Sequence, residues 1–209
     1  LGLLGCSQPQ VSREPFGQPP ELPGEDVLVV AKPDDASGLD PALISDGESS
    51  QVCRNIFDTL VRHSADSMKL EPALAISWEY SADGRSWLFH LRRGVHFHDG
   101  SPFDAQAVVD NYRRQMEPEH PLRFAGNRFP YWSDIWGSKP CDIEAVEAVD
   151  TLTVRFRLRQ VVAPFVENLA MPFFAIVSPK ALKKHGSNSF KNPVGTGAYR
   201  FVEWLPRER

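Results

Sequence analysis

Residues 87–116 constrain the fold more than any other stretch, because a strand, a turn and a helix are each indicated there in immediate succession. Trp87, Phe89 and Leu91 occupy alternate positions, which is the period of a strand with one buried face. Residues 98–102, which read His-Asp-Gly-Ser-Pro, have the chemistry of a tight turn, since Gly tolerates positive φ and Pro fixes φ. The first part of this stretch therefore predicts a half-buried strand that ends in a turn.

The second part of the same stretch predicts an amphipathic helix. Asp104 is placed to act as the N-cap, with its carboxylate accepting from the first free N–H groups of the helix. Val108, Tyr112 and Met116 recur every four residues, so they share one face. We expect this face to pack against the preceding strand and its neighbours.

The rest of the chain carries further signals of both kinds. Two hairpins are predicted by alternating apolar residues, at 74–80 with 86–92 around an Asp-Gly turn and at 143–149 with 152–158. Helices are predicted from a cap at Ser49 or Ser50, over 163–170, and over 179–185 with Gly186 at the end. Buried strands are predicted at 27–31 and 173–177, and a last alternating strand at 198–204.

Composition excludes some classes of protein. The chain has 209 residues, enough for one large core or two small ones, and its hydrophobic content of 42% is that of a globular protein rather than a disordered one. The net charge is −4 and no block of Lys and Arg occurs, so a nucleic-acid partner has little support. No apolar run approaches the roughly 20 residues that span a bilayer.

The N-terminus has the pattern of an anchored domain. Residues 1–6 read as the end of a bacterial lipoprotein signal, in which small and apolar residues precede a Cys that becomes lipidated, and residues 7–24 form a Pro-rich tether. We therefore predict that Cys6 carries a lipid; the alternative is an apolar start with an unmodified thiol. Cys53 and Cys141 are left either paired in a disulfide or apart.

One motif suggests metal binding, but its sequence context argues against it, and no motif indicates catalysis. His96, His98 and Asp99 combine imidazole and carboxylate as transition-metal sites do, yet the turn ends the strand there and no second ligand cluster is evident. We predict no metal site. No Gly-x-Ser-x-Gly elbow or other nucleophile arrangement is present either, so we expect no catalytic activity.

The best candidates for ligand contact lie in a Gly-rich segment and an aromatic loop. Gly195-Thr196-Gly197 lacks the rest of any phosphate-loop motif, so its glycines either permit a turn or let the backbone approach a ligand. Residues 118–140 form a long segment rich in aromatic side chains, which either pack in the core or line a site. The predicted ligand-binding residues are Tyr131, Trp132, Trp136, Gly195, Thr196 and Gly197.

Four separated stretches resemble a known family. The most specific is residues 91–112, LRRGVHFHDGSPFDAQAVVDNY, and the others are residues 55–61, 74–92 and 192–204. All four are similar, in the same order, to the bacterial family 5 extracellular solute-binding proteins, which are peptide and nickel receptors of ABC importers. The resemblance implies that residues 98–100 are a structural turn, and that charged anchors for a ligand lie mostly in a later lobe.

The resemblance also implies an architecture and a function. The expected fold class is α/β, the first lobe of a two-lobed periplasmic-binding-protein-like (type II) fold with a mixed sheet, spanning 25–209 with a hairpin-rich insert at about 45–160. The implied function is capture of short peptides outside the cytoplasmic membrane, without a cofactor, for delivery to an ABC permease and its ATPase. Alternatives are a nickel chelate, glutathione or oligosaccharide ligand, or a lipid-anchored interaction domain without a transported solute.

Overall fold

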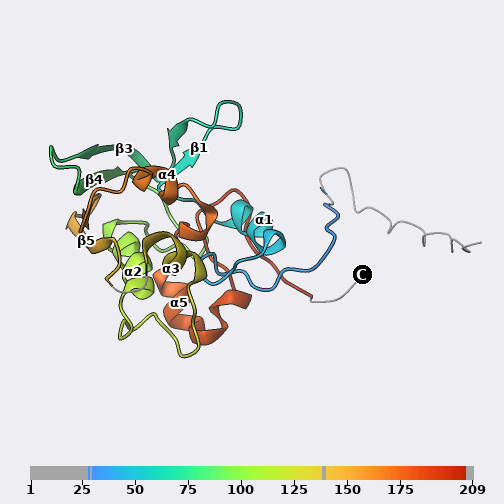
Figure 1. Cartoon of the computed structure of the whole chain (residues 1–209). Helices are drawn as coiled ribbons and strands as arrows, with labels where there is room; N and C mark the ends of the chain where they lie inside the picture. Colours follow the sequence, from blue (N-terminus) through green and yellow to red (C-terminus); the bar gives the residue numbers. More distant parts are fainter. Residues whose placement is uncertain (1–27, 29, 138–139, 206–209) are drawn as a thin grey trace, which may run out of the picture. The chain divides into compact units, whose positions relative to one another are not determined.

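The structure is a computed structural model that describes residues 28, 30–137 and 140–205 (Figure 1). By its internal contacts the chain divides into residues 1–33 and residues 34–209, and the second unit contains all the regular elements. The helices are α1 (Gly47–Ile56), α2 (Ala105–Met116), α3 (Pro130–Trp136), α4 (Phe165–Leu169) and α5 (Pro179–His185), with 3-10 turns η1 (Pro172–Phe174) and η2 (Gly186–Lys191). The strands are β1 (Val61–His63), β2 (Leu70–Pro72), β3 (Ala75–Tyr80), β4 (Ser86–Leu91), β5 (Ile143–Asp150) and β6 (Thr153–Leu158).

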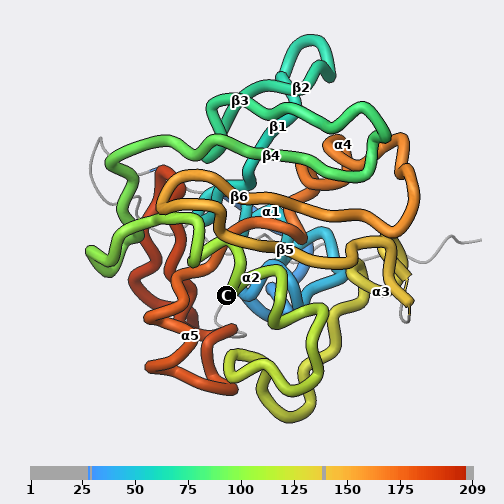
Figure 2. The backbone as a smooth tube through the Cα atoms, turned by 90° about the vertical axis from the view of Figure 1, so that its left-hand side faces the viewer, coloured from blue at the N-terminus to red at the C-terminus, as the bar shows by residue number. Residues whose placement is uncertain are grey.

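Both predicted hairpins are confirmed, and they combine into one four-stranded sheet with the order β3-β4-β6-β5 (Figure 2). In the central pair, Phe89 of β4 lies opposite Val154 of β6, and both side chains are fully buried. A separate ribbon pairs β1 with β2. Every strand pairing in the described residues is antiparallel, whereas we expected a mixed sheet. Short connections reverse the chain between β1 and β2, β3 and β4, and β5 and β6, and the two hairpins then join through an antiparallel pairing of β4 with β6.

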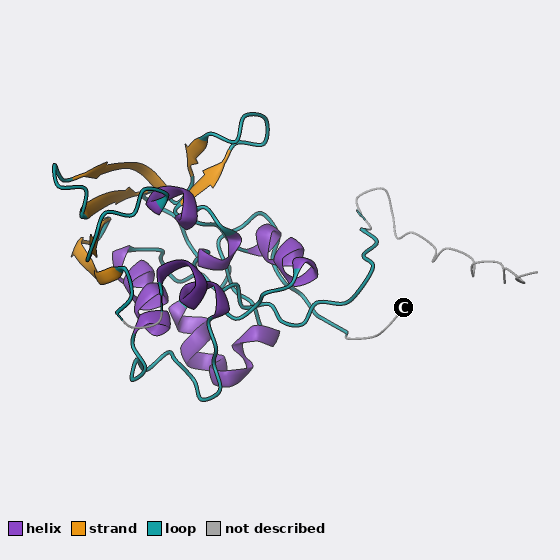
Figure 3. Cartoon of the chain, in the orientation of Figure 1, coloured by secondary structure: helices purple, strands orange, loops and turns teal. Residues whose placement is uncertain are grey.

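The predicted central helix is confirmed as α2, which packs on β5 and β6 of the sheet (Figure 3). The Asp104 carboxylate accepts a 2.8 Å hydrogen bond from the Ala107 N–H, as expected of its N-cap role. Tyr112 is fully buried, with its ring 4.9 Å from that of Phe156 in an edge-to-face arrangement. Burial raises the pKa of the Tyr112 hydroxyl far above its usual range.

A buried ion pair attaches the segment before α1 to this core. Arg114 of α2 donates two hydrogen bonds of 2.8 Å to the carboxylate of Asp40, and the side chains are 0% and 1% exposed. The Arg114 guanidinium also lies 5.7 Å from the ring centroid of Phe129. The pair connects residues that are 74 positions apart in the sequence.

Helix α1 begins earlier than predicted. Asp46 rather than Ser49 or Ser50 is the N-cap, and its carboxylate accepts a 2.7 Å hydrogen bond from the Ser49 N–H. The Ser49 hydroxyl is buried and instead accepts from the Ser37 N–H. The two serines were poor predictors of the cap because an Asp stood one turn ahead of them.

The predicted strands at 173–177 and 198–204 are wrong. The first is buried as expected, but its N–H groups bond to scattered partners, such as Ile176 to the Asp58 carbonyl, rather than to one strand. In the second, Tyr199 and Val202 are exposed. Neither segment pairs with a strand among the described residues, and an apolar or alternating pattern forms a strand only when a partner is available.

The predicted buried strand at 27–31 is wrong for the residues that the structure describes. Leu28 and Val30 lie outside regular secondary structure and their side chains are exposed, and the other two valines of this run lie outside the described residues. The predicted lipidation site Cys6 and the tether at 7–24 also lie outside the described residues. Within the described part of the chain, no helix is long and apolar enough to cross a bilayer.

Candidate functional site

The Gly-rich segment lies against the end of α1. The Gly197 N–H donates to the Ile56 carbonyl at 2.9 Å, and the Thr196 hydroxyl donates to the Asp58 carboxylate at 2.8 Å. A Cβ at Gly195 would lie 2.1 Å from the Ile56 carbonyl oxygen. The glycines are therefore required by a close approach of two backbones, a use that the sequence analysis did not predict. Contact of Gly195 and Gly197 with a ligand stays a prediction.

His98 holds the same segment from the other side. The backbone N–H of His98 donates to the Gly195 carbonyl at 2.9 Å, and the ring Nε2 lies 2.8 Å from the Gly197 carbonyl oxygen. Because a carbonyl oxygen only accepts, Nε2 carries the proton in this contact. His98 thus positions the Gly-rich segment.

The neighbouring Asp99 confirms the turn that we expected at this position. Its carboxylate accepts hydrogen bonds from the N–H and hydroxyl of Ser101 and from the Ser178 hydroxyl. Burial would raise the pKa of Asp99, but these hydrogen bonds and nearby Lys180 hold it below its usual range. The described residues contain no group of His, Cys, Asp and Glu side chains that could hold a metal ion.

A cleft of about 460 Å³ opens where α1, the β1–β2 ribbon and the segment around η1 meet. Its apolar walls include Phe57, Met171, Phe173 and Ala175. The residues that line it are Cys53, Arg54, Phe57, Asp58, Thr59, Arg62, His63, Ala73, Ala170, Met171, Pro172, Phe173 and Ala175. A concave, mainly apolar space with a few polar groups is typical of small-molecule sites.

The charged side chains of this cleft are of both signs. Arg54 and Arg62 are exposed, and Arg62 lies 3.4 Å from Glu71 in a surface ion pair. Asp58 is half-buried and is held in place by Thr196. This arrangement can accommodate a ligand that carries both an anionic and a cationic group.

Both predicted site regions reach the cleft lining through one contact each. Thr196 contacts it through Asp58, and Tyr131 of α3 contacts it through Phe173, with the two rings stacked 3.5 Å apart at 7°. Neither Tyr131 nor Thr196 is itself among the lining residues. Sequence reasoning missed Asp58, although it lies in the family-like stretch 55–61.

The other predicted aromatic residues lie in the hydrophobic core. Trp132 and Trp136 are 4% and 0% exposed, and the Trp136 ring packs 5.5 Å from Phe165 and 5.6 Å from Phe174. The segment 118–140 is thus partly helical, with Pro130 at the first turn of α3, rather than one irregular loop. Contact of these two residues with a ligand stays a prediction.

The two cysteines of the folded unit are not joined to each other. Cys53 is buried on the cleft wall, whereas the Cys141 thiol donates to the Ile143 carbonyl at 2.8 Å. Burial raises the pKa of the Cys141 thiol above its usual value. The disulfide that the sequence left open is therefore absent between these two described residues.

Comparison with solved structures confirms the expected fold class. The chain is similar to the ABC transporter-associated periplasmic binding protein DppA of Helicobacter pylori in complex with the peptide STSA, with a TM-score of 0.76 and 37% identity. That match covers 84% of this chain and 36% of that one. A dipeptide-binding protein of Pseudoalteromonas in complex with Met-Leu matches with a TM-score of 0.74 and 27% identity, over 82% of this chain and 36% of that one.

Curated proteins of similar sequence are also binding proteins. Di/tripeptide-binding protein 1 of Pseudomonas aeruginosa is 35% identical over 85% of this chain and 35% of its own length. Glutathione-binding protein GsiB of Pectobacterium atrosepticum is 38% identical over 84% of this chain and 32% of its own length. The chain thus spans about a third of the length of these relatives.

The family model described as "Bacterial extracellular solute-binding proteins, family 5 Middle" matches residues 69–209. This match includes the predicted signature at 91–112, the Asp99 turn and the Gly-rich segment. The chain therefore belongs to the bacterial extracellular solute-binding proteins of family 5.

Proposed function

We propose that this chain is part of the solute-binding component of an ABC importer, which captures short peptides outside the cytoplasmic membrane and delivers them to a permease. The observation that carries the proposal is the cleft beside the Gly-rich segment, which combines apolar walls with Arg54, Arg62 and Asp58. A short peptide has both a carboxylate and an ammonium end, so it matches charges of both signs. Peptides also occur in the solved complexes of two similar proteins.

The mechanism that we propose is closure of two lobes on the solute, with this chain as the first lobe. Closure is favoured when a ligand contacts both lobes, because the closed state then binds it more tightly than the open state. The chain's part in this process is to hold the ligand by position and charge. We propose no catalytic step, and the energy for transport comes from the ATPase partner.

The test is a thermal-shift screen of the intact protein against dipeptides, tripeptides, glutathione and a nickel chelate. A ligand at 100 times its Kd stabilises the folded protein by about 2.7 kcal/mol. We expect the peptides to give the largest shift. A larger shift with glutathione or a chelate would replace the peptide by that ligand, and no shift with any solute would favour the interaction-domain alternative.

A matched pair of Arg variants locates the site. Arg54→Gln is expected to weaken peptide binding by about tenfold, because it removes a charged hydrogen-bond donor from the cleft. Arg128→Gln removes an exposed Arg outside the cleft and is expected to leave binding unchanged. Equal affinities for both variants in calorimetry would exclude Arg54 from the site.

We also propose that Cys6 carries a lipid that anchors the protein to a membrane in the periplasm or cell envelope. The proposal rests on the apolar and small residues before Cys6 and the Pro-rich tether after it. Mass spectrometry of the protein from its native membrane tests it. We expect an acylated peptide that begins at Cys6, and release of a Cys6→Ser variant from the membrane; an unmodified Cys6 would disprove the anchor.

A further inference from the structure

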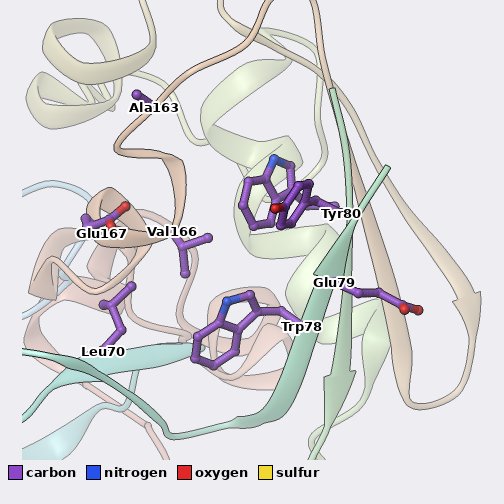
Figure 4. A pocket seen from close by; sticks show the side chains of 8 residues that line it. Leu70, Trp78, Glu79, Tyr80, Ala163, Val166 and Glu167 are labelled. Carbon is purple, nitrogen blue, oxygen red and sulfur yellow. The ribbon is translucent and has the colours of Figure 1, made fainter. Parts of the chain in front are cut away.

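A second hollow is separate from the cleft, because the two sites share no lining residue. It has a volume of about 440 Å³ and lies between strand β3 and helix α4 (Figure 4). We call it the aromatic groove. It is lined by Leu70, Trp78, Glu79, Tyr80, Trp87, Ala163, Val166 and Glu167.

Three aromatic side chains from two paired strands form one wall of the aromatic groove. Trp78 and Tyr80 are two positions apart on β3, so they lie on the same face of the sheet. Trp87 of β4 lies opposite Tyr80 in the strand register, with the two ring centroids 4.9 Å apart. Figure 4 shows Trp78 and Tyr80 on the side of β3 that faces Val166.

This wall is only partly covered: Trp78 and Trp87 are half-buried against the core, and Tyr80 is exposed. The Tyr80 side chain is 67% exposed, and β3 is an edge strand of the four-stranded sheet. Helix α4 covers the neighbouring part of the same face, where Phe165 packs 5.4 Å from the Trp87 ring. Large aromatic side chains left uncovered beside a hollow are typical of binding sites.

The charged residues of the aromatic groove are acidic, whereas the cleft has charges of both signs. None of its lining residues is Lys, Arg or His, whereas Arg54, Arg62 and His63 line the cleft. Glu167 of α4 lies exposed at its margin. Glu79 also belongs to the lining, but Figure 4 shows its carboxylate on the other side of β3, and it lies 3.5 Å from His90.

We propose that the aromatic groove binds a compact organic cation, such as a small quaternary ammonium compound. A cation is attracted to the faces of Trp and Tyr rings, and Trp is the strongest of these partners. The Glu167 carboxylate adds an anionic group at the margin, and Leu70 and Val166 give apolar contact for the methyl groups of such a cation. This site goes beyond the proposed capture of peptides and does not depend on it.

The first test is a titration of the intact protein with choline and with its uncharged isostere, in which a tert-butyl group replaces the trimethylammonium group. The two compounds have the same shape, so their difference isolates the charge. We expect choline to bind at least about fivefold more tightly and to shift the indole N–H signals of Trp78 and Trp87 in NMR spectra. Equal affinities, or no shift of these two signals, would overturn the proposal.

Matched variants locate the charge and the ring that carry the selectivity. Glu167→Gln is expected to weaken choline binding by about threefold, whereas Glu144→Gln, an exposed residue of β5 outside both linings, leaves it unchanged. Tyr80→Leu is expected to remove most of the preference for choline over the isostere. Tyr80 is largely exposed, so an unchanged melting temperature verifies that this variant folds.

Two further outcomes separate this proposal from the proposed function. Peptide binding in the cleft is expected to continue in Tyr80→Leu, and choline binding is expected to continue in Arg54→Gln. Loss of choline binding in Arg54→Gln would mean that choline occupies the cleft instead, and would overturn the aromatic groove as its site. A protein that binds choline but no peptide would contradict only the proposed function.

Discussion

Two junctions hold remote segments of the chain in place by opposite physical means. At the first, the Arg114 guanidinium and the Asp40 carboxylate form a fully buried ion pair with two hydrogen bonds of 2.8 Å. At the second, Gly195 and Gly197 bring their backbone against Ile56, and no side chain would fit there. The first junction depends on charge and the second depends on the absence of a Cβ.

The difference determines which changes each junction tolerates. A buried charge is costly when its partner is removed, yet replacing both partners by apolar residues of similar size is often neutral. A backbone contact is indifferent to charge, but one added methyl group forces atoms apart. The two junctions are therefore expected to respond to different substitutions, and each of the following predictions tests that contrast.

The largest effect is expected at the ion pair. Asp40→Ala leaves the Arg114 guanidinium buried without its partner, and its Nε already has no hydrogen bond, so the free energy of unfolding should fall by about 3–5 kcal/mol. Chemical denaturation of the intact protein measures this loss. The double variant Asp40→Leu with Arg114→Met should recover most of the stability, and a double variant as unstable as Asp40→Ala would contradict the charge argument.

The second effect is expected at the glycine junction. Gly195→Ala places a Cβ 2.1 Å from the Ile56 carbonyl oxygen, so unfolding should become easier by about 1–3 kcal/mol. Gly47→Ala is the control, because a Cβ at this helical position meets no atom within 4 Å. It should be neutral or slightly stabilising. Equal melting temperatures for the two variants would show that the backbones separate without cost.

A third junction combines hydrogen bonding with charge, and its effect should be smaller. The buried Ser178 hydroxyl donates to the Asp99 carboxylate at 2.7 Å and accepts from the Ala181 N–H as the N-cap of α5. Ser178→Ala removes both bonds and should cost about 1–2 kcal/mol. Hydrogen exchange of the α5 amides would locate the loss, which should exceed any change in α2.

Local sequence signals were sufficient for the elements whose partners are close in the sequence. The Asp83-Gly84 turn connects β3 to β4, and the Asp104 cap starts α2, as predicted. The failures are segments whose partners are remote. Residues 198–204 alternate like β6, but β6 has β4 and β5 beside it, whereas Tyr199 bonds only to the Asn55 carbonyl through its N–H.

The candidate site was predictable only in part for the same reason. The family-like stretches located the Gly-rich segment and the Asp99 turn, but no pattern in the sequence indicates that Gly195 meets Ile56 or that Thr196 reaches Asp58. The pairing of Tyr131 with Phe173 likewise joins two segments that no local rule connects. Contacts between segments that are distant in the sequence follow from the fold as a whole.

The smallest effect is expected from pH, and it separates the charged junction at Asp99 from the uncharged glycine junction. Hydrogen bonds hold the pKa of Asp99 below its usual value near 3.8 even though burial opposes this, so its ionised form contributes stability above that pH. The contribution is lost as the pH falls through the lowered pKa. The difference in unfolding free energy between the natural protein and Asp99→Asn should therefore be largest at neutral pH and shrink below about pH 4. The cost of Gly195→Ala has no such origin and should stay constant over the same range. If the Asp99→Asn difference were also constant, the hydrogen bonds to Asp99 would contribute through shape rather than charge.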